Sequence, residues 1–195
     1  MRILASVAAA CICVSLAGAR AFDPENPTKD TFDHGVALYD AGKYEEAYKV
    51  FRSIEDENVS AMHNVAWMRR KGQGTKKDLE GAAEMYKRAA MAGDPLSQAD
   101  LGEMLLKGEV EGANPKAAAQ WLSLAAAAHH PVAEFELGEL YETGSGVGQD
   151  LAIARELYED AAVRGVPGAK QRLAALPAVP PAAPNAAPAR KPPSP

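Results

Sequence analysis

The hydrophobic and polar positions in the central part of the chain repeat at a fixed step of 36 residues. Ala66, Gly102 and Gly138 share one register of this repeat. The same step aligns three glycines and three alanine pairs: Gly72, Gly108 and Gly144, then Ala89-Ala90, Ala125-Ala126 and Ala161-Ala162. Three units align without an insertion, which makes chance an implausible source and indicates a repeat protein.

Each unit has the pattern of two helices joined by a glycine-containing turn. The first helix carries apolar or small residues at a spacing of three to four, as in Ala133, Leu137 and Leu140. The second helix follows a residue whose side chain can accept the free amide hydrogens of its first turn: Asp78, Asn114 or Asp150. Each second helix should end before the proline that opens the next segment: Pro95, Pro131 or Pro167.

A further hairpin is predicted upstream, and a short capping helix is predicted downstream. A single hairpin cannot bury its apolar face, so stability must come from stacked neighbours, of which at least three are needed. We therefore predict an all-α solenoid of about four hairpins, spanning residues 31–176. The predicted boundaries are about 31–54, 59–94, 95–130 and 131–166 for the hairpins and 167–176 for the cap.

The three units resemble the Sel-one-like repeat, a branch of the tetratricopeptide superfamily. The third unit carries the family pattern almost throughout: Leu137-Gly138, Tyr141, Gly144, Gly146-Val147, Asp150, Ala154, Tyr158, Ala161-Ala162 and Gly165. The first unit departs at Ala66 and Arg69, and the second departs at Leu105 and in its loop. The upstream hairpin is similar to an ordinary tetratricopeptide repeat. The resemblance implies an adaptor between proteins, often at the bacterial envelope.

The first 21 residues predict a cleaved secretory signal. Arg2 supplies a positive start, and the uncharged run 3–16 is about 14 residues long, which is too short to cross a membrane core that needs roughly 20. Cleavage is expected after Ala21 or Ala19, which leaves 22–30 as an N-terminal extension. We expect export to the periplasm, with secretion or lipid attachment at Cys11 as alternatives.

The opposite end of the chain, residues 177–195, is rich in proline and alanine and includes the basic pair Arg190-Lys191. Proline lacks an amide donor and fixes its own dihedral angle, so helix and sheet are excluded there. We predict a disordered spacer, with a docking segment as the alternative.

Composition and motifs argue against several functions. The formal net charge is −5 and no basic cluster is present, so nucleic acid is not an expected partner. Both cysteines, Cys11 and Cys13, fall within the predicted signal, and neither a metal-ligand motif nor a nucleophile with its base is found. We predict no enzymatic activity, no metal and no cofactor. The pair His129-His130 is expected to stabilise a helix C-terminus.

The first helices of such hairpins line the concave surface, and the repeat register selects the residues that face it. The candidate partner-binding residues are Phe32, Tyr39, His63, Asn64, Trp67, Arg70, Asp100, Glu103, Phe135, Glu136, Glu139 and Glu142. They form an aromatic end and an acidic end, which would suit a peptide with apolar anchors and a Lys/Arg cluster.

Two interpretations of Trp67 stay open: a contact site for the partner, or packing on the neighbouring hairpin. Trp121, at a core register, is expected to be buried. The predicted function is a non-enzymatic protein–protein adaptor or regulator in the bacterial periplasm. The alternative is a glycan- or peptidoglycan-binding module that uses the aromatic end as a stacking platform.

Overall fold

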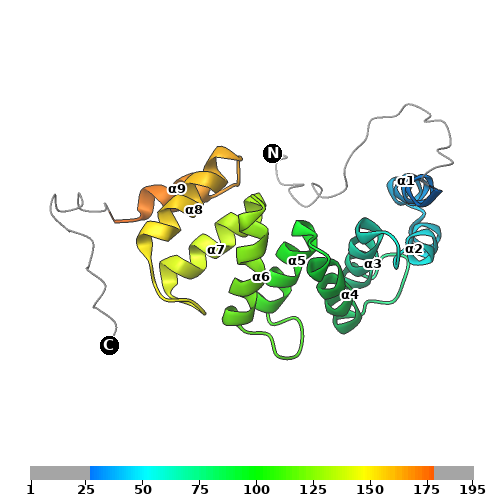
Figure 1. Cartoon of the computed structure of the whole chain (residues 1–195), viewed down its shortest axis with the longest axis horizontal. Helices are drawn as coiled ribbons and strands as arrows, with labels where there is room; N and C mark the ends of the chain where they lie inside the picture. Colours follow the sequence, from blue (N-terminus) through cyan, green and yellow to red (C-terminus); the bar gives the residue numbers. More distant parts are fainter. Residues whose placement is uncertain (1–26, 178–195) are drawn as a thin grey trace, which may run out of the picture.

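A computed structural model describes residues 27–177, and this part of the chain contains nine helices and no strand (Figure 1). The helices are α1 (Pro27–Asp40), α2 (Tyr44–Ser53), α3 (Val59–Lys71), α4 (Leu79–Met91), α5 (Pro95–Leu106), α6 (Pro115–Ala127), α7 (Pro131–Thr143), α8 (Leu151–Val163) and α9 (Ala169–Ala175). The predicted secretory signal and most of the proline-rich tail lie outside the described residues.

Each helix packs on its neighbours along the chain, so the helices form four hairpins followed by the short helix α9. Figure 1 shows the hairpins following one another along an arc. Helices α3, α5 and α7 lie on the inner side of this arc, and α4 and α6 lie on its outer side. This arrangement confirms the predicted all-α solenoid with a C-terminal capping helix.

The buried residues recur at the 36-residue step. Four small residues, one at the start of each of α3, α5, α7 and α9, are fully buried: Ala61, Ser97, Ala133 and Ala169. Tyr86, Leu122 and Tyr158 on the second helices are also fully buried. In each hairpin, residues at the same register positions therefore pack between its two helices and against the next hairpin, as stacking requires.

Small residues on the first helices allow this close packing. A Cβ atom added to Gly138 would lie 2.8 Å from the ring of Tyr158, and one added to Gly102 would lie 2.7 Å from Leu122. Such distances are shorter than a carbon–carbon contact, so a larger residue would force the helices apart.

Helix N-termini are capped as the sequence predicts. The side chains of Asp78, Asn114 and Asp150 accept backbone amide hydrogens in the first turns of α4, α6 and α8. Asn58 and Asp94 do the same for α3 and α5, also 36 residues apart. These bonds satisfy amide donors that have no partner within the helix.

The prediction that His129-His130 stabilises a helix C-terminus was wrong for His130. His130 stands 36 residues after Asp94, and its Nδ1 accepts the amide hydrogen of Ala133 at 3.3 Å as the N-cap of α7. Burial lowers its pKa, which suits a ring nitrogen that must stay unprotonated to accept a hydrogen bond. His129 adopts a left-handed backbone (φ 59°) in the register that Gly93 and Gly165 occupy in the other units.

Trp121 is less buried than expected. It is only partly buried and packs at the edge of the core cluster formed by the first hairpins. Within residues 27–177, no helix combines the length and apolar character required to span a membrane.

Candidate protein-binding surface

We call the surface formed by α1, α3, α5 and α7 the inner wall. It carries the candidate partner-binding residues, and its character changes along the arc. Aromatic side chains come from α1 and α3, and most of the carboxylates come from α5 and α7.

At the aromatic end, Trp67 and Tyr39 are linked by hydrogen bonds. The Trp67 indole N–H donates to the Tyr39 hydroxyl at 3.3 Å, and that hydroxyl donates to Gln73 Oε1 at 2.7 Å. Trp67 is partly buried against the core, and the Lys71 ammonium lies 4.5 Å from its ring centroid. Asn64 lies beside Trp67 around a very small cavity. The geometry supports packing as one role of Trp67 and leaves part of the ring accessible.

The two phenylalanines expected on the inner wall pack within the stack. Phe32 lies 5.5 Å from the Phe51 ring, measured between centroids, and Phe135 lies 5.6 Å from the ring of Tyr158. Both are partly buried against core clusters. Their principal contacts therefore join helices of the solenoid to one another.

Arg70 joins two consecutive repeats. Its side chain is 5% exposed, and it donates to Glu103 at 2.6 Å and to both carboxylate oxygens of Glu109 at 2.8 and 2.9 Å. Burial acts against its charge, but the hydrogen bonds that it donates to Glu109 and Glu103 raise the pKa of Arg70 overall. The guanidinium therefore stays charged and holds α3 against α5 and the loop that follows α5.

His63 makes a second link between the same two helices. It is buried, and its Nε2 lies 2.8 Å from Oδ2 of Asp100. Arg70 Nη1 lies 3.7 Å from the other oxygen of that carboxylate. Asp100 thus has two basic neighbours, both supplied by α3.

The carboxylates near Arg70 are held in their ionised form. The hydrogen bond from Arg70 lowers the pKa of Glu109. Burial would raise the pKa of Glu103, but hydrogen bonds from Lys107 and Arg70 lower it overall. Each of these carboxylates therefore already contacts a basic group, and Glu103 still keeps 29% of its side chain exposed.

At the far end of the inner wall, Arg172 on α9 contacts two carboxylates of α7. Its guanidinium lies 2.6 Å from Glu139 and 3.5 Å from Glu142, and Glu142 also accepts a 2.5 Å hydrogen bond from the Tyr158 hydroxyl. Glu139 and Glu142 still keep 36% and 23% of their side chains exposed.

Glu136 differs from the other carboxylates on this wall. Its Oε2 atom is inaccessible to solvent and has no hydrogen-bond partner among the described residues. Burial, and then the charge of Glu103, raise the pKa of Glu136 to about 8. Asp100 and Glu139 add to this rise, and Lys107 opposes it.

Three residues that contact the candidate residues of the inner wall are not predicted by the sequence analysis. Glu109 lies in the altered loop of the second unit, where the repeat pattern gives no guidance. Lys107 follows α5 and bonds Glu103 at 2.5 Å. Arg172 could have been found, because extending the 36-residue step beyond the third unit places it in register with Glu136.

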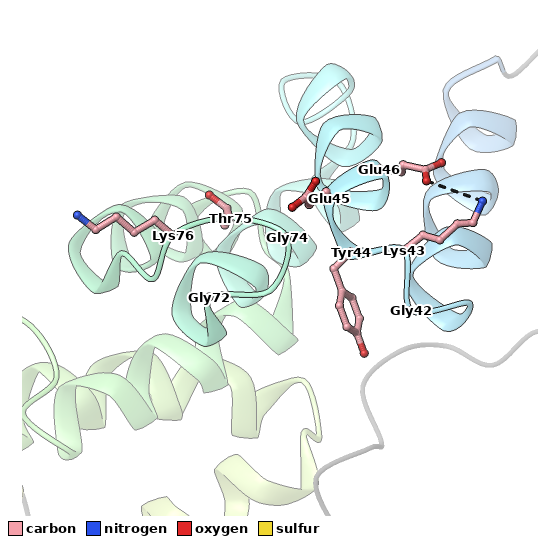
Figure 2. Close-up of a pocket in the computed structure, with 9 residues that line it drawn as sticks. All are labelled: Gly42, Lys43, Tyr44, Glu45, Glu46, Gly72, Gly74, Thr75 and Lys76. Atoms are coloured by element: carbon pink, nitrogen blue, oxygen red, sulfur yellow. Dashed lines mark ion pairs between the residues drawn. The ribbon is translucent and has the colours of Figure 1, made fainter.

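A pocket of about 650 Å³ lies between the turn of the first hairpin and the α3–α4 loop (Figure 2). Its lining residues are Gly42, Lys43, Tyr44, Glu45, Glu46, Gly72, Gly74, Thr75 and Lys76. Lys43 and Glu46 form an exposed ion pair at 3.8 Å. Lysines and glutamates are mixed around it, so the pocket presents no single charge to a ligand. In the described part of the chain, no group of three or more potential metal ligands comes together.

Comparison with known families identifies the repeat units. The Sel1 repeat matches residues 59–94, 95–130 and 131–165, which together make up more than half of the chain. The chain belongs to the Sel1 repeat family. The Sel1 repeat is generally a protein–protein interaction module, and Sel1 repeat proteins are typically non-enzymatic scaffolds.

Two solved structures resemble this Sel1 repeat protein. A Sel1 repeat protein from Oxalobacter formigenes is 35% identical with a TM-score of 0.69, and the match covers 73% of this chain and 58% of that one. A protective antigen of uropathogenic Escherichia coli with an SLR fold is 29% identical with a TM-score of 0.70, covering 76% of this chain and 33% of that one. This chain thus spans little more than half of the first protein and a third of the second. No curated protein matches it significantly.

Proposed function

We propose that this Sel1 repeat protein is a non-enzymatic adaptor or regulator of the bacterial periplasm that binds a basic segment of another protein along its inner wall. The observation that carries the proposal is a row of carboxylates that remains open to a partner. Asp100, Glu103, Glu139 and Glu142 keep 20–36% of their side chains exposed although each already contacts a basic or hydroxyl group.

The exposed parts of these carboxylates favour a partner that carries positive charge. Complementary charges at an interface increase the association rate and fix the orientation of the partner. The accessible part of Trp67 would add an apolar contact at one end of the same wall, and aromatic residues often dominate interface energies. An extended or helical segment with lysine or arginine residues and one apolar anchor fits both features.

The periplasmic location rests on the predicted signal, residues 1–21. It is tested by fractionating cells that express a C-terminally tagged protein and sequencing the N-terminus of the exported form. We expect a first residue of Phe22 or Arg20. A cytoplasmic protein that retains Met1 would contradict the proposed location.

The binding surface is tested by a matched pair of charge reversals. Glu139→Lys changes the inner wall, whereas Glu156→Lys makes the same change at an exposed position of α8. Partners captured by proximity labelling from the exported wild-type protein should be lost with the first variant and kept with the second. Circular dichroism must show that both variants keep their helices. Equal capture by both variants would remove the inner wall as the binding surface.

The glycan-binding alternative has less structural support. A sugar-stacking platform needs a free ring face, and Lys71 lies over the ring of Trp67 while the ring of Phe32 packs on Phe51. Retention of the protein by peptidoglycan or polysaccharide, with loss of retention in a Trp67→Ala variant, would favour this alternative over a protein partner.

A further inference from the structure

We infer that the junction between α5 and α7 on the inner wall receives one arginine side chain from the partner, at the place that Arg70 occupies one repeat earlier. This inference rests on the proposed function, because it names the chemistry that the partner presents to that surface. It is carried by a comparison of two successive junctions in the same molecule.

The junction between α3 and α5 shows how the inner wall holds a guanidinium. Arg70 from α3 lies 3.7 Å from Asp100 and 2.6 Å from Glu103, which are on α5. His63, also from α3, lies 2.8 Å from Asp100. One helix therefore supplies the basic groups, and the next helix supplies the two carboxylates.

The next junction keeps the carboxylates and lacks the basic groups. At the 36-residue step, Glu136 and Glu139 of α7 take the places of Asp100 and Glu103. The places of Arg70 and His63 are taken by Leu106 and Ala99, which carry no donor.

Glu139 gains another partner and Glu136 does not. Arg172 from α9 contacts Glu139 at 2.6 Å. Glu136 Oε2 is left without a hydrogen bond within residues 31–177 and is itself shielded from solvent, whereas the residue as a whole is partly exposed on the inner wall. The basic group Lys107 favours the charged form of Glu136, but its ammonium is bound to Glu103 at 2.5 Å.

A guanidinium from the partner would supply the hydrogen bond and the positive charge that Glu136 lacks. Besides burial, the charges of Glu103, Glu139 and Asp100 disfavour ionisation of Glu136, and that of Lys107 favours it. Burial and this negative surrounding raise the pKa of Glu136 to about 8. A guanidinium donates two parallel N–H groups to a carboxylate and stays charged at all relevant pH values, which makes arginine better suited than lysine.

The first test introduces a guanidinium into the protein itself by substitution. In a Leu106→Arg variant, the new side chain occupies the register of Arg70, and the pKa of Glu136, followed by carboxyl ¹³C NMR, should fall by about 1–3 pH units. Leu106→Gln is the matched control and should leave that pKa nearly unchanged. A Leu106→Arg protein that is folded and has the wild-type pKa at Glu136 would overturn the inference.

The second test leaves the protein unaltered and uses acetyl-arginine amide as the probe, with acetyl-citrulline amide as its neutral isostere. At pH 7.5 the arginine compound should shift the Glu136 carboxyl signal in a saturable way, and the citrulline compound should not. In the Leu106→Arg variant, the introduced guanidinium already occupies the α5–α7 junction, so the arginine compound should no longer shift the signal. A Glu136 response no larger than that of the exposed Glu156 would contradict the inference.

These results separate the inference from the proposed function. If neither test succeeds but Glu139→Lys still loses the partner, the arginine site is wrong and binding along the inner wall stands. If both tests succeed but Glu139→Lys retains the partner, the junction binds a guanidinium and the proposed partner surface is wrong.

Discussion

Glu136 and Arg70 are both ionisable groups of the inner wall, but Arg70 is buried, Glu136 is partly buried, and their surroundings differ. Arg70 has carboxylates on three residues within 4 Å. Glu136, among the described residues, has an unpartnered oxygen and mainly negative neighbours. Ionisation of Glu136 should therefore destabilise the fold, and removal of Arg70 should do the same.

The first prediction concerns pH and Glu136. Because its folded pKa of about 8 lies above its unfolded value, the unfolded state loses this proton first, and wild-type stability falls as the pH rises between the two values. Glu136→Gln should match the wild type near pH 4 and exceed it at pH 9 by on the order of 2–5 kcal/mol. Urea unfolding at both pH values measures the difference. Equal stability of the two proteins at pH 9 would contradict the assignment.

The second prediction compares two arginines. Arg70→Gln leaves Glu109 without its bidentate partner and Glu103 with Lys107 alone, and should lower the free energy of unfolding by about 2–4 kcal/mol at pH 7. Arg172→Gln, at a side chain that is 44% exposed, should cost less than about 1 kcal/mol.

The Arg70 effect should depend on pH in a defined direction. Arg70 lowers the pKa values of Glu103 and Glu109, so its contribution is present above their unfolded pKa and is lost as the pH falls. Denaturation curves at pH 7 and at about pH 3 should show the cost of Arg70→Gln shrinking at the lower pH. A cost independent of pH would mean that Arg70 acts through packing alone.

At the scale of helices and loops, one glycine in each of the α3–α4 and α7–α8 loops sets how closely the loop approaches the preceding hairpin. Gly146 in the α7–α8 loop has φ +74°, and an added Cβ would lie 2.4 Å from the backbone carbonyl carbon of Pro115 at the start of α6. Gly74, two repeats earlier, meets the backbone of Tyr44 in the same way at 2.1 Å. The loop can therefore pack on the preceding hairpin only if the residue at this position has no side chain.

The third prediction uses two of the three glycines of the α7–α8 loop, Gly146 and Gly148, as a matched pair. Gly146→Ala should destabilise the protein by about 1–3 kcal/mol, because of both the left-handed backbone and the clash. Gly148→Ala, where nothing lies within 4 Å of the added atom, should change stability by less than about 0.5 kcal/mol. Thermal unfolding of both variants tests the difference, and similar melting temperatures would contradict the packing argument.

Helix caps and buried positions are predicted well from the sequence because they depend on interactions within one helical turn or on the repeat period. Caps such as Asp150 act within one helical turn, and buried alanines such as Ala133 follow from the period. Contacts between repeats are harder to predict, because a register position alone does not say whether Arg70 points to a partner or to the next helix. His130 differs from its prediction for a local reason: it follows the C-terminus of α6, but its register with Asp94 makes it the N-cap of α7.

At the scale of the whole molecule, the stack needs an end that covers its last hairpin. Tyr158 packs with Leu173 and Leu176 of the C-terminal cap, and Arg172 of the same segment joins α7. Among the described residues, α9 is thus a first helix without a second one, as expected for a terminal cap of a repeat array.

The fourth prediction removes this cap. Truncation after Pro167 exposes the apolar residues of α8 and should lower the stability of the last hairpin by on the order of 2–4 kcal/mol. Hydrogen exchange should accelerate in α7 and α8 and remain nearly unchanged in α3 and α4. Uniform acceleration along the chain would show that the solenoid unfolds as one unit.

The inner wall is the central element of this account, and site-specific photo-crosslinking in the exported protein tests it most directly. A photoreactive amino acid replaces Leu106 on the inner wall or Leu124, which is 51% exposed on α6 of the outer layer. We predict a covalent adduct with a partner protein from position 106, lost when Glu139→Lys is added, and none from position 124. Adducts from position 124 alone would contradict the account.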